Sequence, residues 1–246
     1  MPQPIRLERN WREPGGPVVK DGFLVPTQAV AVMFMDHWLC RDAVQFYHGE
    51  EFLLSTTSDL TLSALGAGDG IVVVLTARHQ LALEQRLRKL GIDFDELLRE
   101  QRMIAIDACA TLSSITVNGG HDFSPFMEIV GGAINRAAEA TGRQQAQIMV
   151  LGELTALSWA EHGLAGMMDV AQFWRVLARL LSFSYLSCYP IDYFAAPGME
   201  DVFLRICAGH STVIPPDDYP NTGVERRILR ATVRAYGEPS RLPAVS

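Results

Sequence analysis

The sequence predicts an α/β domain in which a parallel sheet carries helices on both faces, giving three layers. Apolar segments of strand length alternate along the chain with segments whose apolar residues recur at helical spacing. One of the strand-length segments, Ile71–Leu75 (IVVVL), is apolar throughout, as expected of a strand that is covered on both faces. With 246 residues, 48% of them hydrophobic, the chain is long enough to bury one large core.

The strands are predicted from apolar, largely β-branched or aromatic runs that turn residues or polar residues interrupt. The predicted central strands are Ala43–Tyr47, Ile71–Leu75, Met103–Asp107, Ile148–Gly152 and Ser184–Tyr189, and Ala29–Met35 is a further candidate strand.

Helices are predicted between these strands. Thr76 is expected to cap a helix with Leu83 and Leu87 on one face, and Ser124-Pro125 to begin another. A further helix is predicted with Phe52 on its apolar face. The other predicted helices are Phe94–Arg99, Leu154–Glu161, Met167–Leu181 and one around Met199–His210.

Proline content and the spacing of apolar residues divide the chain into three predicted regions. Residues 1–24 hold several prolines and are predicted to be an arm, and residues 25–215 to form the folded domain. Residues 216–246 form a tail in which GVERRILRATVRAYG predicts a short basic helix, docked on this domain or on a partner.

Composition excludes several classes of protein. The net charge of −7 disfavours direct nucleic-acid binding, because an acidic chain repels phosphates. The charged, proline-containing start predicts no signal peptide, and no apolar run has the length of a membrane span. The four cysteines form no C-x-x-C pair and are expected to be buried, reduced thiols, so we expect a cytoplasmic location.

Ligands of parallel α/β sheets bind beyond the carboxyl ends of the strands. The candidates by this rule are Tyr47, His48, Thr76, Asp107, Glu153 and Tyr189. A phosphate-binding loop is absent, because the corresponding segment, FYHGEEFLL, has one glycine, no lysine, and two acidic residues, Glu50 and Glu51, at the start of its helix. We therefore predict that ATP does not bind, and we expect no cofactor.

Two further pairs of residues have the chemistry of a site. Asp107 and Glu153 are a conceivable acid–base pair, although carboxylates at helix starts are more often caps. Cys207 and His210 have a spacing that can share a metal, but two ligands do not make a site, so no metal is predicted.

Several segments occur together in one order: AVQFYHGEEFLL, GDGIVVVLTARHQLALEQRLRKLGID, IAIDACATL, GELTALSWAEHG, FSYLSCYP and ICAGHSTVIP. In this respect the chain resembles the MEDS domain (methanogen/methylotroph, DcmR sensory domain) over about residues 41–215. The resemblance implies a RecA-like three-layer sheet that has lost its phosphate-binding loop and that senses small hydrocarbon derivatives. It places family positions on Phe46, Tyr47, Glu51, Gly152, Glu153, Tyr189, Pro190, Cys207 and His210.

The chain departs from the family at Asp42, where members often have histidine, and it has no room for a helix-turn-helix ahead of the sensor. We therefore expect a stand-alone sensory module that passes its signal to a regulatory protein such as a histidine kinase or a transcription factor. Two alternatives stay open: a protein-interaction scaffold with a closed ancestral nucleotide site, and an enzyme using Glu153 or Asp107. Glu153 is expected to face the strand-end crevice and to matter more for signalling than for stability. Self-association also stays open.

Overall fold

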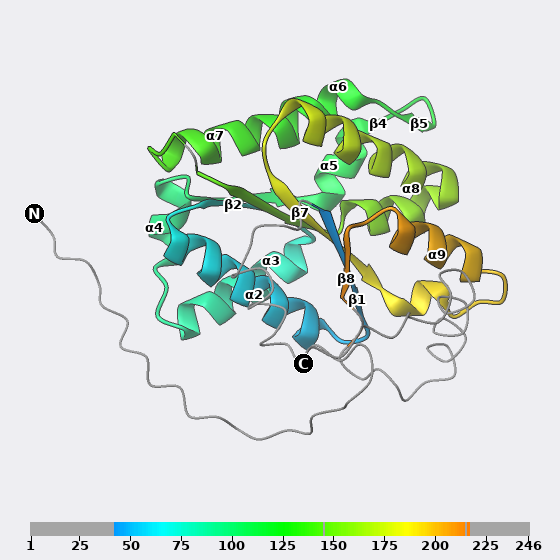
Figure 1. The fold of residues 1–246 in the computed structure, drawn as a ribbon, viewed down its shortest axis with the longest axis horizontal. Coiled ribbons are helices and arrows are strands. Elements are labelled where there is room, and N and C mark those ends of the chain that lie inside the picture. Colours follow the sequence, from blue (N-terminus) through cyan, green and yellow to red (C-terminus); the bar gives the residue numbers. More distant parts are fainter. Residues whose placement is uncertain (1–41, 145, 215, 217–246) are drawn as a thin grey trace, which may run out of the picture.

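A sheet of six parallel strands organises the part of the chain that the computed structural model describes, residues 42–144, 146–214 and 216. The strands lie in the order β3-β2-β6-β7-β1-β8 (Figure 1). Their bounds are β1 (Asp42–Tyr47), β2 (Gly70–Leu75), β3 (Met103–Asp107), β6 (Ile148–Gly152), β7 (Ser184–Pro190) and β8 (Thr212–Ile214). The five predicted central strands are confirmed. The candidate strand Ala29–Met35 and the predicted tail helix lie outside the described residues.

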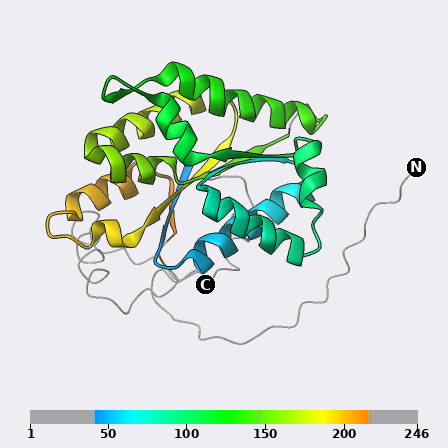
Figure 2. The same ribbon diagram turned by 180° about the vertical axis from the view of Figure 1, so that it is seen from behind.

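Helices cover both faces of this sheet, so the predicted three-layer α/β fold is confirmed (Figures 1 and 2). One face carries α2 (Glu50–Ala67), α3 (Ala77–Lys89) and α4 (Phe94–Arg99). The other carries α5 (Ala108–Ile115), α6 (Phe123–Phe126), a π-helical turn η1 (Met127–Gly131), α7 (Gly132–Ala140), α8 (Leu154–Leu180) and α9 (Glu200–Ala208). A small hairpin of β4 (Thr116–Val117) and β5 (Gly120–His121) follows α5, and a 3-10 turn η2 (Ile191–Phe194) follows β7.

The alternation of side chains along β2 shows why the strand is apolar throughout. Ile71, Val73 and Leu75 pack in the core beneath α2–α4, whereas Val72 and Val74 pack in the core beneath α5–α8. Because successive side chains point to opposite faces, a strand that is covered on both sides has no polar face.

Polar side chains begin several helices. Thr76 Oγ1 accepts the His79 N–H at the start of α3, as predicted. The predicted start at Ser124-Pro125 is wrong, because Asp122 Oδ1 accepts the Ser124 N–H and the helix begins at Phe123. Pro125 is tolerated in this first turn, where amide groups have no acceptor within the helix.

The two helical segments predicted around residue 163 form α8, with a kink between them at Gly163. Its φ of 66° lies in the left-handed region that glycine adopts without strain. The second segment therefore runs in a different direction from the first (Figure 1).

Two expectations drawn from composition meet different outcomes. The prediction that the cysteines are buried is wrong for Cys109, which lies on the solvent side of α5 while Ala108 and Leu112 face the core. Cys188 is buried, as expected. Among the described residues, no helix combines the length and the apolar character needed to cross a membrane.

Candidate functional site

Residues from three strand ends meet where the chain changes direction across the sheet. The chain moves from β2 outward to β3 and then returns to β6, which is β2's other neighbour. Thr76 follows β2 and Glu153 follows β6, and the Glu153 N–H donates to the Val74 carbonyl at 3.0 Å. The strand-end rule therefore predicts a site at this point, and polar side chains gather there.

Glu153 is the centre of this group. Its Oε1 accepts the Tyr47 hydroxyl at 2.9 Å, and its Oε2 accepts the backbone N–H of Thr76 at 3.3 Å. The Nδ1 of His79 lies 2.7 Å from the same Oε2. Glu153 is 4% exposed, Tyr47 6% and His79 9%, so these contacts are shielded from water.

The other side of His79 leads to the surface. Its Nε2 lies 3.3 Å from Oε1 of Glu50, a residue in the first turn of α2. The Glu50 side chain is partly exposed and also pairs with Arg78 at 2.8 Å. We call Tyr47, Glu50, His79 and Glu153 the strand-end cluster.

The electrostatics of the cluster follow from this pairing. The hydrogen bond to Glu153 raises the pKa of His79 above its usual value, and Glu50 adds to the effect. Burial, followed by the charge of Glu153, raises the pKa of Tyr47, so the phenol keeps its proton and remains a donor. The cluster is thus an imidazole between two carboxyl groups that favour its charged form, with a phenol at the buried end.

In this arrangement the buried side chains at the strand ends bond to one another. The Glu153 carboxylate accepts from three donors, and Glu153 does not cap α8 with its side chain. A buried carboxylate requires a partner, and here that partner is His79. His79 belongs to no recognised motif, so the sequence did not single it out.

The other predicted strand-end residues do not join the cluster. Asp107 caps α5, its Oδ1 accepting the Ala110 N–H at 2.8 Å, so the pairing of Asp107 with Glu153 that an enzyme would need is not formed. Glu51 pairs with Arg86, and His48 lies 3.5 Å from Asp192. Phe46 packs in the core against the rings of Phe194 and Phe203.

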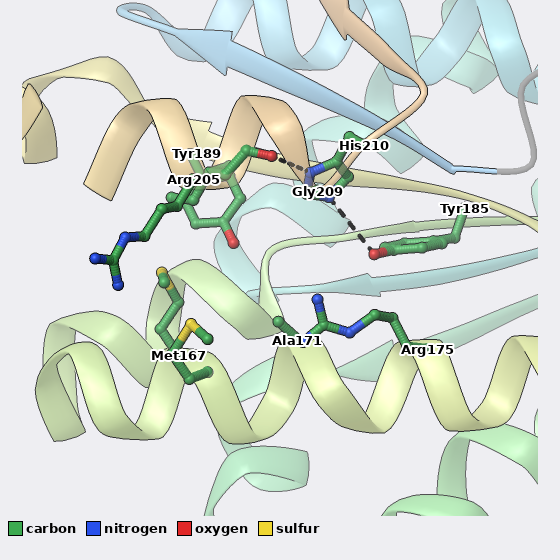
Figure 3. A pocket seen from close by; sticks show the side chains of 10 residues that line it. Met167, Ala171, Arg175, Tyr185, Tyr189, Arg205, Gly209 and His210 are labelled. Atoms are coloured by element: carbon green, nitrogen blue, oxygen red, sulfur yellow. Dashed lines mark hydrogen bonds between the residues drawn. The ribbon is translucent and has the colours of Figure 1, made fainter. Parts of the chain in front are cut away.

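A separate cavity of about 80 Å³ lies between α8, β7 and α9 (Figure 3). Its lining residues are Met167, Met168, Ala171, Arg175, Tyr185, Tyr189, Arg205, Ile206, Gly209 and His210. Tyr189 is the one predicted ligand-binding residue among them. The cavity forms where segments distant in sequence meet, so no local spacing signalled it.

Cys207 and His210, the metal candidates, have other contacts. The His210 Nδ1–H donates to the Ile206 carbonyl at 2.7 Å. Burial raises the pKa of Cys207 to about 12, which disfavours the thiolate that a metal needs. Within the described residues, no group of three or more His, Cys, Asp or Glu side chains has an arrangement that could hold a metal ion.

Comparison with known proteins adds the family. The model of the MEDS family, "MEthanogen/methylotroph, DcmR Sensory domain", matches residues 43–204, from β1 into α9. The chain belongs to this family. The match spans both the strand-end cluster and the whole of α8, and it confirms the resemblance drawn from the order of the motifs.

A shorter match is to the divinyl chlorophyll a/b light-harvesting protein PcbA of Prochlorococcus marinus (strain NATL2A). It is 36% identical over 84 residues, which is 33% of this chain. The chain spans about a fifth of the length of that protein (22%), and we carry no role over from it.

Proposed function

We propose that this MEDS domain is a sensory module that binds a small hydrocarbon-derived ligand in the cavity between α8, β7 and α9. The cavity carries the proposal: an apolar hollow with a few polar groups at its edge is the usual form of a small-molecule site. The ligand-binding site is thereby moved from the strand ends, where the sequence predicted it, to a neighbouring position that shares Tyr189.

The size of the cavity limits the ligand. An engineered apolar cavity of about 150 Å³ holds benzene, so a cavity of about 80 Å³ suits a body of about three heavy atoms. Met167 and Met168 add adaptable surface, because methionine side chains adjust their shape to irregular partners.

The strand-end cluster supplies the route for the signal. Tyr185 and Tyr189 of β7 line the cavity, while Cys188 of the same strand lies on the opposite face. There burial, followed by the charge of Glu153, raises the pKa of the Cys188 thiol. The helix that lines the cavity, α8, begins directly after Glu153. A ligand that favours one position of β7 or α8 would therefore shift the population of states of the cluster.

The output of the module is proposed to pass to a regulatory protein such as a histidine kinase or a transcription factor, in the cytoplasm. The net charge of −7 supports a protein partner over direct contact with nucleic acid. No catalytic role is proposed, because Asp107 is engaged as a cap and Glu153 is buried among its donors.

A non-catalytic interaction scaffold is the second candidate. The observation that favours it is that Tyr47, His79 and Glu153 are buried and bonded to one another at the strand ends. A scaffold needs no ligand, so ligand binding separates the two functions.

Thermal unfolding with a panel of small hydrocarbon derivatives tests the proposal. Dichloromethane, 1-propanol, propionamide and propionate are each added to the wild type and to Ala171→Phe, in which the cavity is filled. A ligand at a hundred times its Kd stabilises the folded state by about 2.7 kcal/mol, which raises the Tm by about 5–10 °C. We expect at least one probe to do so in the wild type and none in Ala171→Phe.

The matched control is Ala178→Phe, which adds the same ring to an exposed position on the same helix and should keep the response. A wild type that no probe stabilises would favour the scaffold, and a response that survives Ala171→Phe would place the ligand elsewhere.

A further inference from the structure

The charge of the cavity lining has one sign. Arg175, Arg205 and His210 line the cavity, and none of its ten lining residues is acidic. This contrasts with the chain as a whole, which has 28 acidic residues against 21 lysines and arginines. The cavity is therefore a local basic site within an acidic protein, and such a site attracts anions.

Arg175 is placed to meet a ligand. It projects from α8, and its Nε–H donates to Gln172 Oε1 at 3.1 Å. Its two terminal nitrogens form no hydrogen bond with the described part of the chain. Figure 3 shows this end of the guanidinium turned toward the space beneath Tyr185. Two unused donors in a planar fork match the two oxygens of a carboxylate.

His210 stands on the opposite wall, at the end of α9. Because Nδ1–H is fixed on the Ile206 carbonyl, Nε2 is the nitrogen that faces the Tyr185 hydroxyl, at 3.5 Å (Figure 3). This distance is at the outer limit of a hydrogen bond, so an incoming carboxylate oxygen can compete for the imidazole when Nε2 carries a proton.

Asp42 is an acidic group beside this wall. It is not a lining residue, but it interacts with three of them, His210, Tyr185 and Arg175. Its Oδ1 lies 3.5 Å from His210 Nε2 and forms no hydrogen bond among the described residues. Burial raises the pKa of Asp42, although the charges of His210 and Arg175 oppose this. The carboxyl therefore holds its proton more tightly than an exposed aspartate does.

The rest of the lining suits a short apolar chain. Met167, Ala171, Tyr189 and Ile206 present carbon and sulfur atoms, and Met167, Tyr189 and Ile206 are buried. A ligand that uses the whole site thus has a charged end and a body of about three heavy atoms.

We infer that the ligand is a short-chain organic acid whose carboxylate lies between Arg175 and His210 and whose alkyl chain lies against Met167, Tyr189 and Ile206. The inference rests on the proposed function and names the chemical class of its ligand. A neutral hydrocarbon derivative would leave the terminal nitrogens of Arg175 unused.

Calorimetric titration of three probes of similar size tests the inference. Propionate carries the charge, whereas propionamide and 1-propanol have a similar shape without it. We expect propionate to bind with a Kd at least about tenfold lower than either neutral probe, because one charge-assisted hydrogen bond is gained. All titrations are made at one ionic strength in sodium chloride, so that general screening is constant.

Arg175→Gln and Arg179→Gln form a matched pair on α8, since both arginines are exposed and Arg179 does not line the cavity. Arg175→Gln is expected to raise the Kd for propionate at least about tenfold and to leave the neutral probes unchanged, and Arg179→Gln to change neither. Unfolding curves confirm that both variants fold.

The outcomes separate the inference from the function on which it rests. If a neutral probe binds as tightly as propionate, or if Arg175→Gln and Arg179→Gln weaken propionate equally, the ligand class is wrong and the sensory cavity stands. If no probe binds the wild type, the proposed function fails together with the ligand class.

Discussion

His79 joins two carboxylates that lie at different depths in the protein. Glu153 is buried and Glu50 is partly exposed, and each ring nitrogen of His79 faces one of them. The histidine therefore ties the first turn of α2 to the start of α8 through α3. Its protonation controls this tie, because both nitrogens donate only in the charged ring.

The pH dependence of stability follows from the raised pKa of His79. The folded protein binds this proton more tightly than the unfolded chain, so the stabilisation is complete below about pH 6.5 and is lost as the pH rises through the folded-state pKa. His79→Gln should thus lower the free energy of unfolding most at low pH and least at high pH.

Urea unfolding of the wild type and His79→Gln across this pH range measures the difference. His162→Gln, on α8, is the control for loss of a histidine away from the cluster. If the free energy of unfolding of the wild type exceeds that of His79→Gln by the same amount at every pH, the charge of His79 does not stabilise the fold.

The hydrogen bonds of Glu153 also change the loss of stability that we expect for Glu153→Gln. Had it only capped α8, Glu153→Gln would cost about 1 kcal/mol. The structure shows a buried carboxylate with three donors, and loss of a charged hydrogen bond costs about 1.5–3 kcal/mol. The expectation that Glu153 matters more for signalling than for stability therefore no longer follows, and a role in signalling has to be measured beside this loss of stability.

At the scale of elements, the first turn of α2 carries two carboxylates of its own. In this fold an anion would meet the free amides at the helix start. Gly49 begins the helix, and Glu50 and Glu51 already place carboxylates beside those amides. Glu50 is held by Arg78 and His79 and Glu51 by Arg86, so the negative charge is fixed in place.

Mg-ATP is therefore expected not to bind. Isothermal titration at millimolar protein should give heats no different from those of dilution, because the carboxylates at α2 repel a polyphosphate and no lysine lies in the turn. Titration of magnesium chloride alone is the control. A saturable isotherm with a micromolar Kd would contradict this account of α2.

At the scale of the whole molecule, strands were predicted better than sites. Ile71–Leu75 and Ile148–Gly152 were placed within a residue, because burial on both faces leaves a continuous apolar run. The strand-end rule also brought Tyr47, Thr76 and Glu153 together correctly, since parallel strands end at one edge of the sheet.

Features that depend on packing between distant segments could not be predicted. His79 lies 74 residues before Glu153, and its role depends on how α3 sits over the sheet. The start of α6 was misplaced because Asp122 competes with Ser124 as a cap, and local pattern does not rank the two. The cavity needs α8, β7 and α9 in place at once.

The position of the ligand is the central claim, and the methyl groups of methionine report it directly. In spectra of protein labelled with ¹³C at the methionine methyls, addition of propionate or 1-propanol should shift the signals of Met167 and Met168, which line the cavity. Met103 and Met149, in the core beneath α2–α4, serve as internal references and should not move. Saturable shifts confined to Met167 and Met168 are the predicted result. Unchanged signals for this pair, or shifts centred on Met103 and Met149, would contradict a ligand site between α8, β7 and α9.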